Sequence, residues 1–304
     1  MKTSILSKKI YQGGCLIEPS NEKTIFQLKK KELVNIFEKK GLIIFRNFNL
    51  KKENITKFTD IFTEQYANDA MRRSTRLKDK KIRDVDPGNF EMPLHSEASY
   101  SPSWPEIIWF YCNIAPKKSG KTTVCDGKSI YDNLSVNEKK FFLENQILYD
   151  LKIPFGKKNK EKKVNKKSLK PWHIDHPGVK DCFIDFLNKE VMFKLKRYAV
   201  SKLNSSDELA FVNHLQIILD RDPQVIKITM EDGKKFPNKI MKKVKKVSDE
   251  CTVDINWKDG DLCMINNKRF MHGRRKISFK EKRDIVVIQT LKSNFKDSLQ
   301  AYNS

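Results

Sequence analysis

Short apolar runs separated by turns dominate the chain and predict a fold rich in β-strands. Compact runs of β-branched and aromatic residues are typical of buried strands, and Asp-Gly pairs such as those at 126–127, 232–233 and 259–260 favour tight turns. The strand-like runs are Leu42–Phe45, Ile107–Cys112, Thr122–Cys125, Val225–Met230, Thr252–Trp257, Leu262–Ile265 and Ile285–Leu291. We therefore expect an antiparallel barrel or sandwich, and a jelly roll fits this pattern best.

Three other segments follow the helical period. The first, Lys29–Lys40, places its apolar residues on one face and ends at Gly41, a typical helix stop. The second is Asn54–Tyr66, and the third covers about residues 189–219. Residues 68–93 are polar and contain turn chemistry, so this segment is expected to form a loop that could act as a lid.

The order of these segments indicates one domain with an insertion. The sequence contains no internal repeat, and β-rich folds often exceed 200 residues as a single unit. We expect one domain over residues 1–304, with a mostly β, double-stranded β-helix (jelly-roll) core at about 42–127 and 222–292. Helices decorate this core, and a lysine-rich loop with a helical insertion is expected at about 156–221.

The composition is that of a globular protein in a reducing compartment. Hydrophobic residues make up 38% of the 304 positions and aromatic residues 10%, which excludes a disordered chain. No apolar run is as long as a membrane span. The N-terminal residues lack the apolar stretch of a signal peptide, so no signal peptide is expected. The six cysteines are scattered without a C-x-x-C pair. We therefore expect a cytoplasmic protein with reduced thiols.

The net charge of +23 raises the alternative of an anionic partner such as nucleic acid. Lysine outnumbers arginine by 50 to 11, however, and planar recognition of phosphates and bases favours arginine. The densest basic block, residues 157–170, has no interleaved aromatic residues and is typical of a solvated loop. The charge therefore does not by itself indicate a nucleic-acid-binding protein.

Histidine and carboxylate positions predict a metal site. His95 and Glu97 are two residues apart, and in an extended backbone such residues project to the same side, about 6–7 Å apart. A third ligand must come from elsewhere, and His272 is the best candidate because it follows a predicted strand by a short loop. Two histidines and one carboxylate leave open coordination positions, as non-haem iron(II) oxygenases require.

Two other histidine positions are alternatives. His173-Ile174-Asp175, with His176 beside it, repeats the spacing of the first motif. It ends in a turn and no predicted strand follows, so a turn held by local hydrogen bonds is the simpler interpretation. His214 lies in the third helical stretch and is expected at the edge of the core.

The chain resembles the TauD/TfdA-like family of iron(II)- and 2-oxoglutarate-dependent oxygenases, in its clavaminate-synthase-like branch. Four pieces in register carry the resemblance: LIIFRNF at 42–48, LHSEASY at 94–100 with the aromatic strand after it, SGKTTVCDG at 119–127, and the stretch from Gly260 through HGR at 272–274 to Arg283. The resemblance implies a jelly-roll dioxygenase with iron(II), 2-oxoglutarate and O2 as cofactor and co-substrates.

The same resemblance implies residue roles. His95, Glu97 and His272 would bind the iron, while Arg283 and Thr122 would bind the distal carboxylate of 2-oxoglutarate. A planar guanidinium can donate two parallel hydrogen bonds to one carboxylate, which is the physical reason to expect an arginine at this site. Arg274 and Arg275 lie closer to His272 in the chain and compete with Arg283 for this role.

The implied reaction is hydroxylation of an unactivated C–H bond in a small substrate. Related halogenases have a small residue in place of the metal-binding carboxylate, so Glu97 argues against halogenation. A glutamate rather than an aspartate is similar to the branch that oxidises free or carrier-tethered amino acids. An amino-acid-like small molecule is therefore the expected substrate, with a carrier protein as a further expected partner.

A nucleotide-binding loop is the alternative from another class. APKKSGKT at 115–122 comes close to a phosphate-binding loop that follows a strand. Its first glycine is replaced by Ala115, Pro116 stiffens it, and a turn is expected at 126–127 where the supporting helix should begin. These departures favour the oxygenase.

Overall fold

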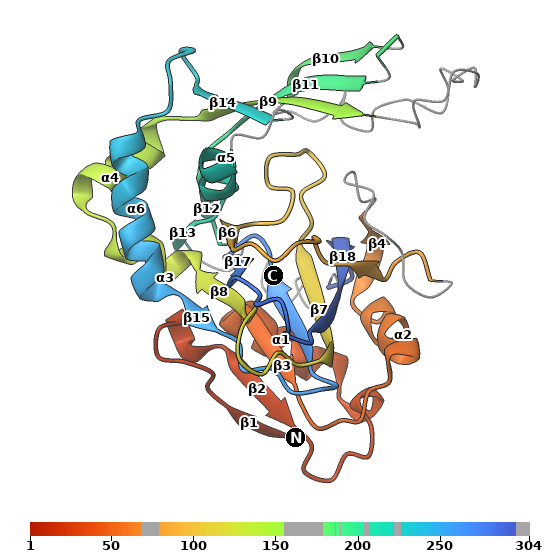
Figure 1. Ribbon diagram of the computed structural model, residues 1–304. Helices are drawn as coiled ribbons and strands as arrows, with labels where there is room; N and C mark the ends of the chain where they lie inside the picture. Colours follow the sequence, from red (N-terminus) through yellow and green to blue (C-terminus); the bar gives the residue numbers. More distant parts are fainter. Residues whose placement is uncertain are drawn as a thin grey trace, which may run out of the picture.

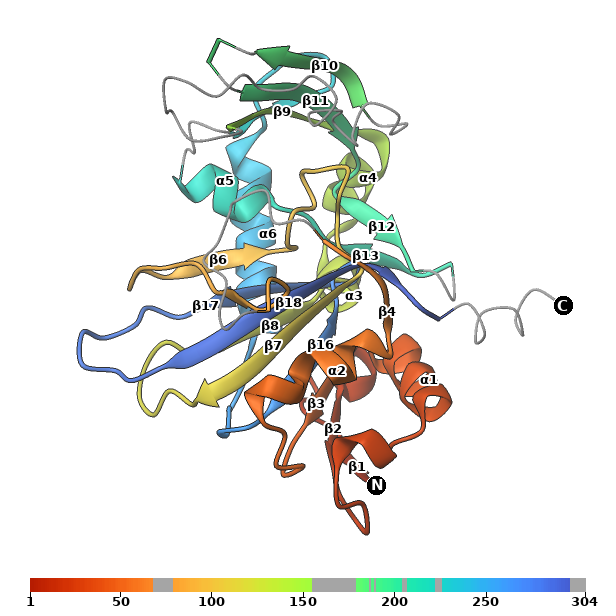
Figure 2. The same cartoon turned by 90° about the vertical axis from the view of Figure 1, so that its right-hand side faces the viewer.

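Two sheets, antiparallel except for the parallel pair β2 and β3, lie face to face and form the predicted jelly roll (Figures 1 and 2). The computed structural model describes residues 1–67, 79–154, 179–185, 187–188, 190–203, 207–221 and 226–295. The larger sheet contains, in spatial order, β1 (Lys2–Ser4), β2 (Cys15–Glu18), β3 (Leu42–Phe45), β16 (Leu262–Asn266), β7 (Ile107–Ile114), β18 (Asp284–Ser293) and β4 (Thr63–Tyr66), with β5 (Arg83–Asp84) also pairing with β18. The smaller sheet contains β15 (Val253–Asp254), β8 (Thr122–Asp126), β17 (Phe270–Arg274) and β6 (Met92–His95).

Successive side chains of β7 point to opposite faces of the larger sheet, so this strand contributes to two hydrophobic clusters. Trp109 and Tyr111 point to the outer face of the larger sheet, where they join one buried cluster. Ile108 and Phe110 point the other way, into the cluster between the two sheets. Every residue from Ile107 to Tyr111 is buried, so this central strand has no solvent face.

Helices cover both outer faces of the sheet pair. The outer face of the larger sheet packs on α1 (Lys30–Lys40) and α2 (Ile55–Asp60). The outer face of the smaller sheet packs on α3 (Gly127–Asn133), α4 (Val136–Glu144), α5 (Leu215–Arg221) and α6 (Asn238–Cys251). Helix α1 ends as predicted at Gly41, whose φ of 69° is left-handed; a Cβ there would come within 2.6 Å of the Phe270 ring.

A separate four-stranded sheet lies beyond these helices (Figure 1). Its order is β10 (Val179–Asp185), β11 (Glu190–Arg197), β9 (Ile147–Pro154) and β14 (Ile226–Met230). A further pair is formed by β12 (Val200–Lys202) and β13 (Leu209–Phe211). Short 3₁₀ turns occur at Tyr11–Gly13, Ile25–Gln27 and Lys52–Asn54. No helix in the described part of the chain is long and apolar enough to cross a membrane.

Three predictions of secondary structure were wrong in part. The helix expected over about 189–219 is mostly strands β11 to β13, with α5 only at its end. The helix expected over Asn54–Tyr66 stops at Asp60, because Thr63–Tyr66 pairs with β18. The strand expected over Thr252–Trp257 is limited to Val253–Asp254. The lysine block at 157–170 lies outside the described residues.

Candidate metal centre and carboxylate pocket

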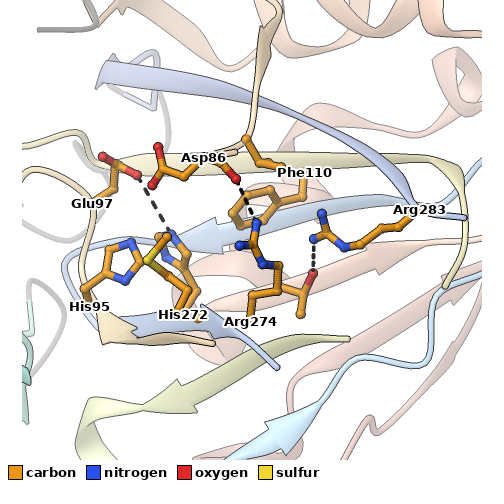
Figure 3. Close-up of a pocket in the computed structure, with 11 residues that line it drawn as sticks. Asp86, His95, Glu97, Phe110, His272, Arg274 and Arg283 are labelled. Carbon is orange, nitrogen blue, oxygen red and sulfur yellow. Dashed lines mark hydrogen bonds and ion pairs between the residues drawn. The ribbon is translucent and has the colours of Figure 1, made fainter. Parts of the chain in front are cut away.

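The two histidines expected at a metal site lie opposite each other on neighbouring strands. His95 ends β6 and His272 lies in β17, and the two are direct partners in the antiparallel ladder. Directly opposed residues point to the same face of a sheet, and their ring centroids are 4.5 Å apart. Both side chains are buried. Strand register therefore brings these two distant positions together (Figure 3).

Glu97 reaches the same point from a turn, whereas the sequence predicted an extended backbone. The strand ends at His95, and residues 97–100 form a turn in which Ala98 has a φ of 52°. Asn267 holds this turn: its Oδ1 accepts the Glu97 amide at 2.9 Å and its Nδ2 donates to the Glu97 carbonyl at 3.0 Å. A Glu97 carboxylate oxygen consequently lies 4.0 Å from His272 Nε2.

These three side chains have the donor set of an iron(II) site. One ligand atom from each lies within 4.8 Å of the others. His95 Nδ1 is 2.8 Å from the Pro93 carbonyl oxygen; a ring that donates there keeps the Nε2 lone pair for a metal, as histidine ligands usually do. Two imidazoles and one carboxylate on one side of an ion leave its other positions open. The donors therefore fit iron(II).

Thr122 and Arg283 form a second polar group in the same pocket. Arg283 donates from Nε to the Gly120 carbonyl at 2.9 Å and from Nη2 to Thr122 Oγ1 at 3.3 Å. Trp257 Nε1 donates to the same oxygen at 2.9 Å, so the threonine hydroxyl accepts twice and retains its own hydrogen to donate. Burial, together with the nearby charge of Arg274, lowers the pKa of Arg283 to about 10. These donors fit a carboxylate such as that of 2-oxoglutarate.

Arg274 also lines the pocket, but backbone oxygens occupy its guanidinium. Its Nη1 donates to the Asp86 carbonyl at 2.8 Å, and its Nη2 donates to the carbonyls of Gly88 at 2.8 Å and Phe90 at 3.2 Å. Arg274 thereby ties residues 86–90 to β17 (Figure 3). These residues belong to the expected lid segment, of which only 79–93 is described.

Apolar side chains line the pocket together with the two polar groups. The pocket is lined by Val85, Asp86, Met92, His95, Glu97, Phe110, Thr122, His272, Gly273, Arg274 and Arg283. The Phe110 ring meets the His272 imidazole edge to face at 5.2 Å between centroids. The sequence did not single out Phe110 as a site residue, although its place in the alternating strand predicts that it faces between the sheets.

The remaining histidines do not join the metal group within the described residues. His214 lies just before α5, buried, with its ring centroid 5.0 Å from that of His95 and its Nδ1 2.9 Å from the Ser96 carbonyl oxygen. It packs against the turn that carries Glu97, and the helix in which it was expected begins only after it, at Leu215. His173 and His176 lie outside the described residues.

Residues 115–122 do not form a phosphate-binding loop. Such a loop leads into a helix, whereas Thr122 begins strand β8. The amides of residues 117–119 donate to the carboxylate of Glu281 instead. The turn expected at 126–127 was wrong: Asp126 is the N-cap of α3, accepting a hydrogen bond from the Lys128 amide at 3.0 Å.

Known proteins resemble the chain over most of its length. The sequence model of the taurine catabolism dioxygenase TauD, TfdA family matches residues 19–289. A clavaminate synthase-like protein of Arabidopsis thaliana is 24% identical over 272 residues, which are 81% of each chain. Two solved structures are similar: PvcB of Pseudomonas aeruginosa, with a TM-score of 0.61 at 15% identity over 95% of this chain and 90% of the other, and AAD-2 in complex with Mn(II) and N-oxalylglycine, with a TM-score of 0.58 at 15% identity over 95% and 97%.

Proposed function

Because the chain belongs to the TauD/TfdA family of iron(II)- and 2-oxoglutarate-dependent oxygenases, we propose that His95, Glu97 and His272 hold the iron in this protein. The observation that carries the proposal is the cross-strand pairing of the two histidines, with the Glu97 carboxylate beside them. Each of these three residues is at most 7% exposed, so a bound ion would be shielded from bulk water.

The Thr122 and Arg283 group is proposed to bind the distal carboxylate of 2-oxoglutarate. The guanidinium of Arg283 is largely withdrawn from solvent, and its hydrogen bonds go to two neutral oxygens, the Gly120 carbonyl and the Thr122 hydroxyl. A buried cation gains most from a ligand of opposite charge. Arg274 donates its hydrogen bonds to the carbonyls of the segment 86–90 and is not expected to bind the co-substrate.

Bound iron and 2-oxoglutarate supply oxidation of a C–H bond by O2, with release of CO2 and succinate. The chain's own part is orientation and the exclusion of water. Phe110 and Met92 place apolar surface against the pocket, and Phe110 packs directly on His272. A Glu97 carboxylate that binds the iron would leave no room for a halide ligand, so hydroxylation is the expected outcome.

The substrate is proposed to be a small, amino-acid-like molecule whose unactivated C–H bond is hydroxylated. This rests on the metal-binding glutamate and on the likeness to clavaminate-synthase-like proteins. A panel of free amino acids and of the same amino acids as thioesters should be screened for substrate-dependent succinate release. A response to free amino acids supports the proposal, a response to thioesters alone points to a carrier, and no response to either contradicts the substrate class.

Removing a histidine ligand should abolish metal binding. Protein given iron(II) and 2-oxoglutarate without oxygen should develop a weak visible charge-transfer band, and His95→Ala or His272→Ala should remove it because two protein ligands hold the ion poorly. His173→Ala is the matched control and should retain the band. Loss of the band in the control alone would move the site to the His173-Ile174-Asp175 motif.

The two candidate arginines can be separated by the affinity for 2-oxoglutarate. Arg283→Ala should weaken binding by roughly 30-fold or more, since losing one partner of a buried charge pair costs about 2 kcal/mol or more. Arg274→Ala should change the affinity much less, because the Arg274 guanidinium binds the backbone of residues 86–90 instead. Titration of the visible band measures both, and the reverse order of effects would assign the co-substrate to Arg274.

A further inference from the structure

The carboxylate of Glu281 occupies a concave group of backbone amides. The Lys117 amide donates to Oε1 at 2.7 Å, and the amides of Lys118 and Ser119 donate to Oε2 at 3.1 and 3.0 Å. The Ser119 hydroxyl adds a fourth bond to Oε2 at 3.2 Å. Successive amides that converge in this way form an anion-binding nest. The near match to a phosphate-binding loop at 115–122 is therefore a real anion site, filled by the chain's own carboxylate.

This contact fastens two loops that lie far apart in the sequence. The loop between β7 and β8 and the loop between β17 and β18 run side by side at one end of the sheets (Figure 2). Besides Glu281, they share the bonds from the Gly120 amide to the Lys276 carbonyl at 3.0 Å and from the Ser278 amide to Ser119 Oγ at 2.9 Å. Both bonds use residues next to the nest.

Gly120 connects the nest to the pocket. Its carbonyl accepts Nε of Arg283 at 2.9 Å, which turns the Nη2 of that guanidinium toward Thr122. Gly120 has a φ of 73°, and a Cβ there would come within 2.8 Å of Ile277, so this close approach needs glycine. Any shift of the 117–119 amides moves Gly120 and, with it, the acceptor that orients Arg283.

We propose that Glu281 is a positioning residue for the 2-oxoglutarate site, acting through the nest at 117–119 and Gly120 on Arg283. The inference rests on the proposed role of Arg283 in binding the co-substrate. Without the carboxylate, three amides would converge with no protein acceptor, and the loop between β7 and β8 would lose part of its attachment to the loop between β17 and β18. The bonds from these amides, that of Lys117 first, lower the pKa of Glu281, so the carboxylate is ionised at neutral pH.

Chemical rescue of an emptied nest tests the proposal. Glu281→Ala should weaken 2-oxoglutarate binding roughly tenfold, the lower end of what losing an outer partner of a site costs, as measured by titration of the visible band of the anaerobic iron(II) protein. Added sodium acetate should enter the nest and restore much of the affinity. Acetate should also raise the melting temperature of metal-free Glu281→Ala and not that of the unaltered protein. Glu281→Gln keeps an oxygen acceptor without the charge. Its affinity for 2-oxoglutarate should lie between that of Glu281→Ala and that of the unaltered protein.

Glu144→Ala is the matched control, since it removes an exposed carboxylate of α4 whose ion-pair partner is Lys140 at 3.8 Å. It should bind 2-oxoglutarate normally, and acetate should never improve it. Unchanged affinity in Glu281→Ala and Glu281→Gln overturns the proposal, and so does weakened affinity that acetate fails to restore. If Arg283→Ala also binds 2-oxoglutarate normally, the proposed role of Arg283 has failed; if only Arg283→Ala binds weakly, the inference about Glu281 alone has failed.

Discussion

Trp104 braces the turn that carries Glu97. Its Nε1 donates to Ser96 Oγ at 2.7 Å, and two cations lie against its indole ring: Lys268 Nζ at 3.7 Å and Arg197 Cζ at 4.7 Å from the centroid. Lys268 also donates to the Trp104 carbonyl at 2.9 Å. Cation–π contacts strengthen when the cation is desolvated, so these side chains stiffen the loop behind the metal group.

The partly buried Lys268 should make stability depend on pH. Burial, and secondly the charge of Arg197, lower the pKa of Lys268 from 10.5 to about 7. The unfolded chain keeps the ordinary value, so between these pH values it binds more protons than the native state, and stability rises with pH by at most about 1.4 kcal/mol per pH unit. Lys268→Met should remove this slope, so that its stability relative to the unaltered protein improves as pH falls from 10 to 7. Denaturant unfolding at several pH values measures this, and parallel curves would contradict it.

Residue types that act through local spacing were visible in the sequence, whereas residues that act through the fold were not. His95 and Glu97 form a local motif, the predicted strand before His272 favoured it as the third ligand, and the resemblance added Arg283 and Thr122. Asn267 orients the Glu97 turn, yet nothing near it in the chain predicts a partner at 96–97. The hydrogen bonds of Arg274 were equally unpredictable, because the fold brings their acceptors, the carbonyls of Asp86 and Gly88, from a distant segment.

Strands were predictable where compact runs of β-branched and aromatic residues occur, as in Leu42–Phe45 and in Ile107–Cys112, which the structure extends to Ile114. The stretch Glu190–Arg197 misled because its lysine, leucine and methionine favour helices. It also alternates, with Val191, Phe193 and Leu195 on the face that packs against the core, and pairing with β9 decides the outcome. Tertiary pairing therefore overrode a weak local propensity.

Gly273 controls how closely β17 approaches β6. A Cβ at this position would lie 2.5 Å from the Met92 carbonyl oxygen and 2.8 Å from Thr123 Oγ1. Gly273→Ala should therefore push the two strands apart, at a cost of about 1–3 kcal/mol, and separate His95 from His272. Mn(II) affinity followed by electron paramagnetic resonance should fall, while circular dichroism remains that of a folded protein.

Gly233→Ala provides the comparison for this element. Gly233 has a φ of 82° in a turn where an added Cβ meets no atom within 4 Å. The variant should lose stability through backbone strain and keep its Mn(II) affinity. Equal losses of Mn(II) affinity in the two variants would show that the effect does not come from the spacing of β17 and β6.

One ion pair joins the N-terminal segment and helix α1 to the smaller sheet. Arg269 binds Asp126 through Nη2 at 2.6 Å and Nε at 3.0 Å, and both side chains are at most 4% exposed. The same guanidinium donates to the carbonyls of Tyr11 at 2.9 Å and Lys39 at 3.1 Å. Arg269 thus connects the end of α1, the N-terminal segment, β8 and the start of β17.

Breaking this pair should destabilise the whole molecule. Arg269→Met leaves a buried carboxylate uncompensated, which typically costs about 3–5 kcal/mol. Arg275→Met removes the exposed ion pairs to Asp254 and Glu91 and should cost less than about 1 kcal/mol. Denaturant unfolding compares the two variants, and similar losses would show that the buried pair has no special weight.

The pairing of His95 with His272 has a consequence for assembly. If the alignment of β6 and β17 slipped by a single position, one imidazole would turn to the opposite side of its sheet. With the proposed ligands, iron uptake would therefore be a readout of correct alignment as well as a condition for activity. A newly made copy with a misaligned edge would take up no metal, and it would lack the ligand stabilisation that properly aligned copies gain.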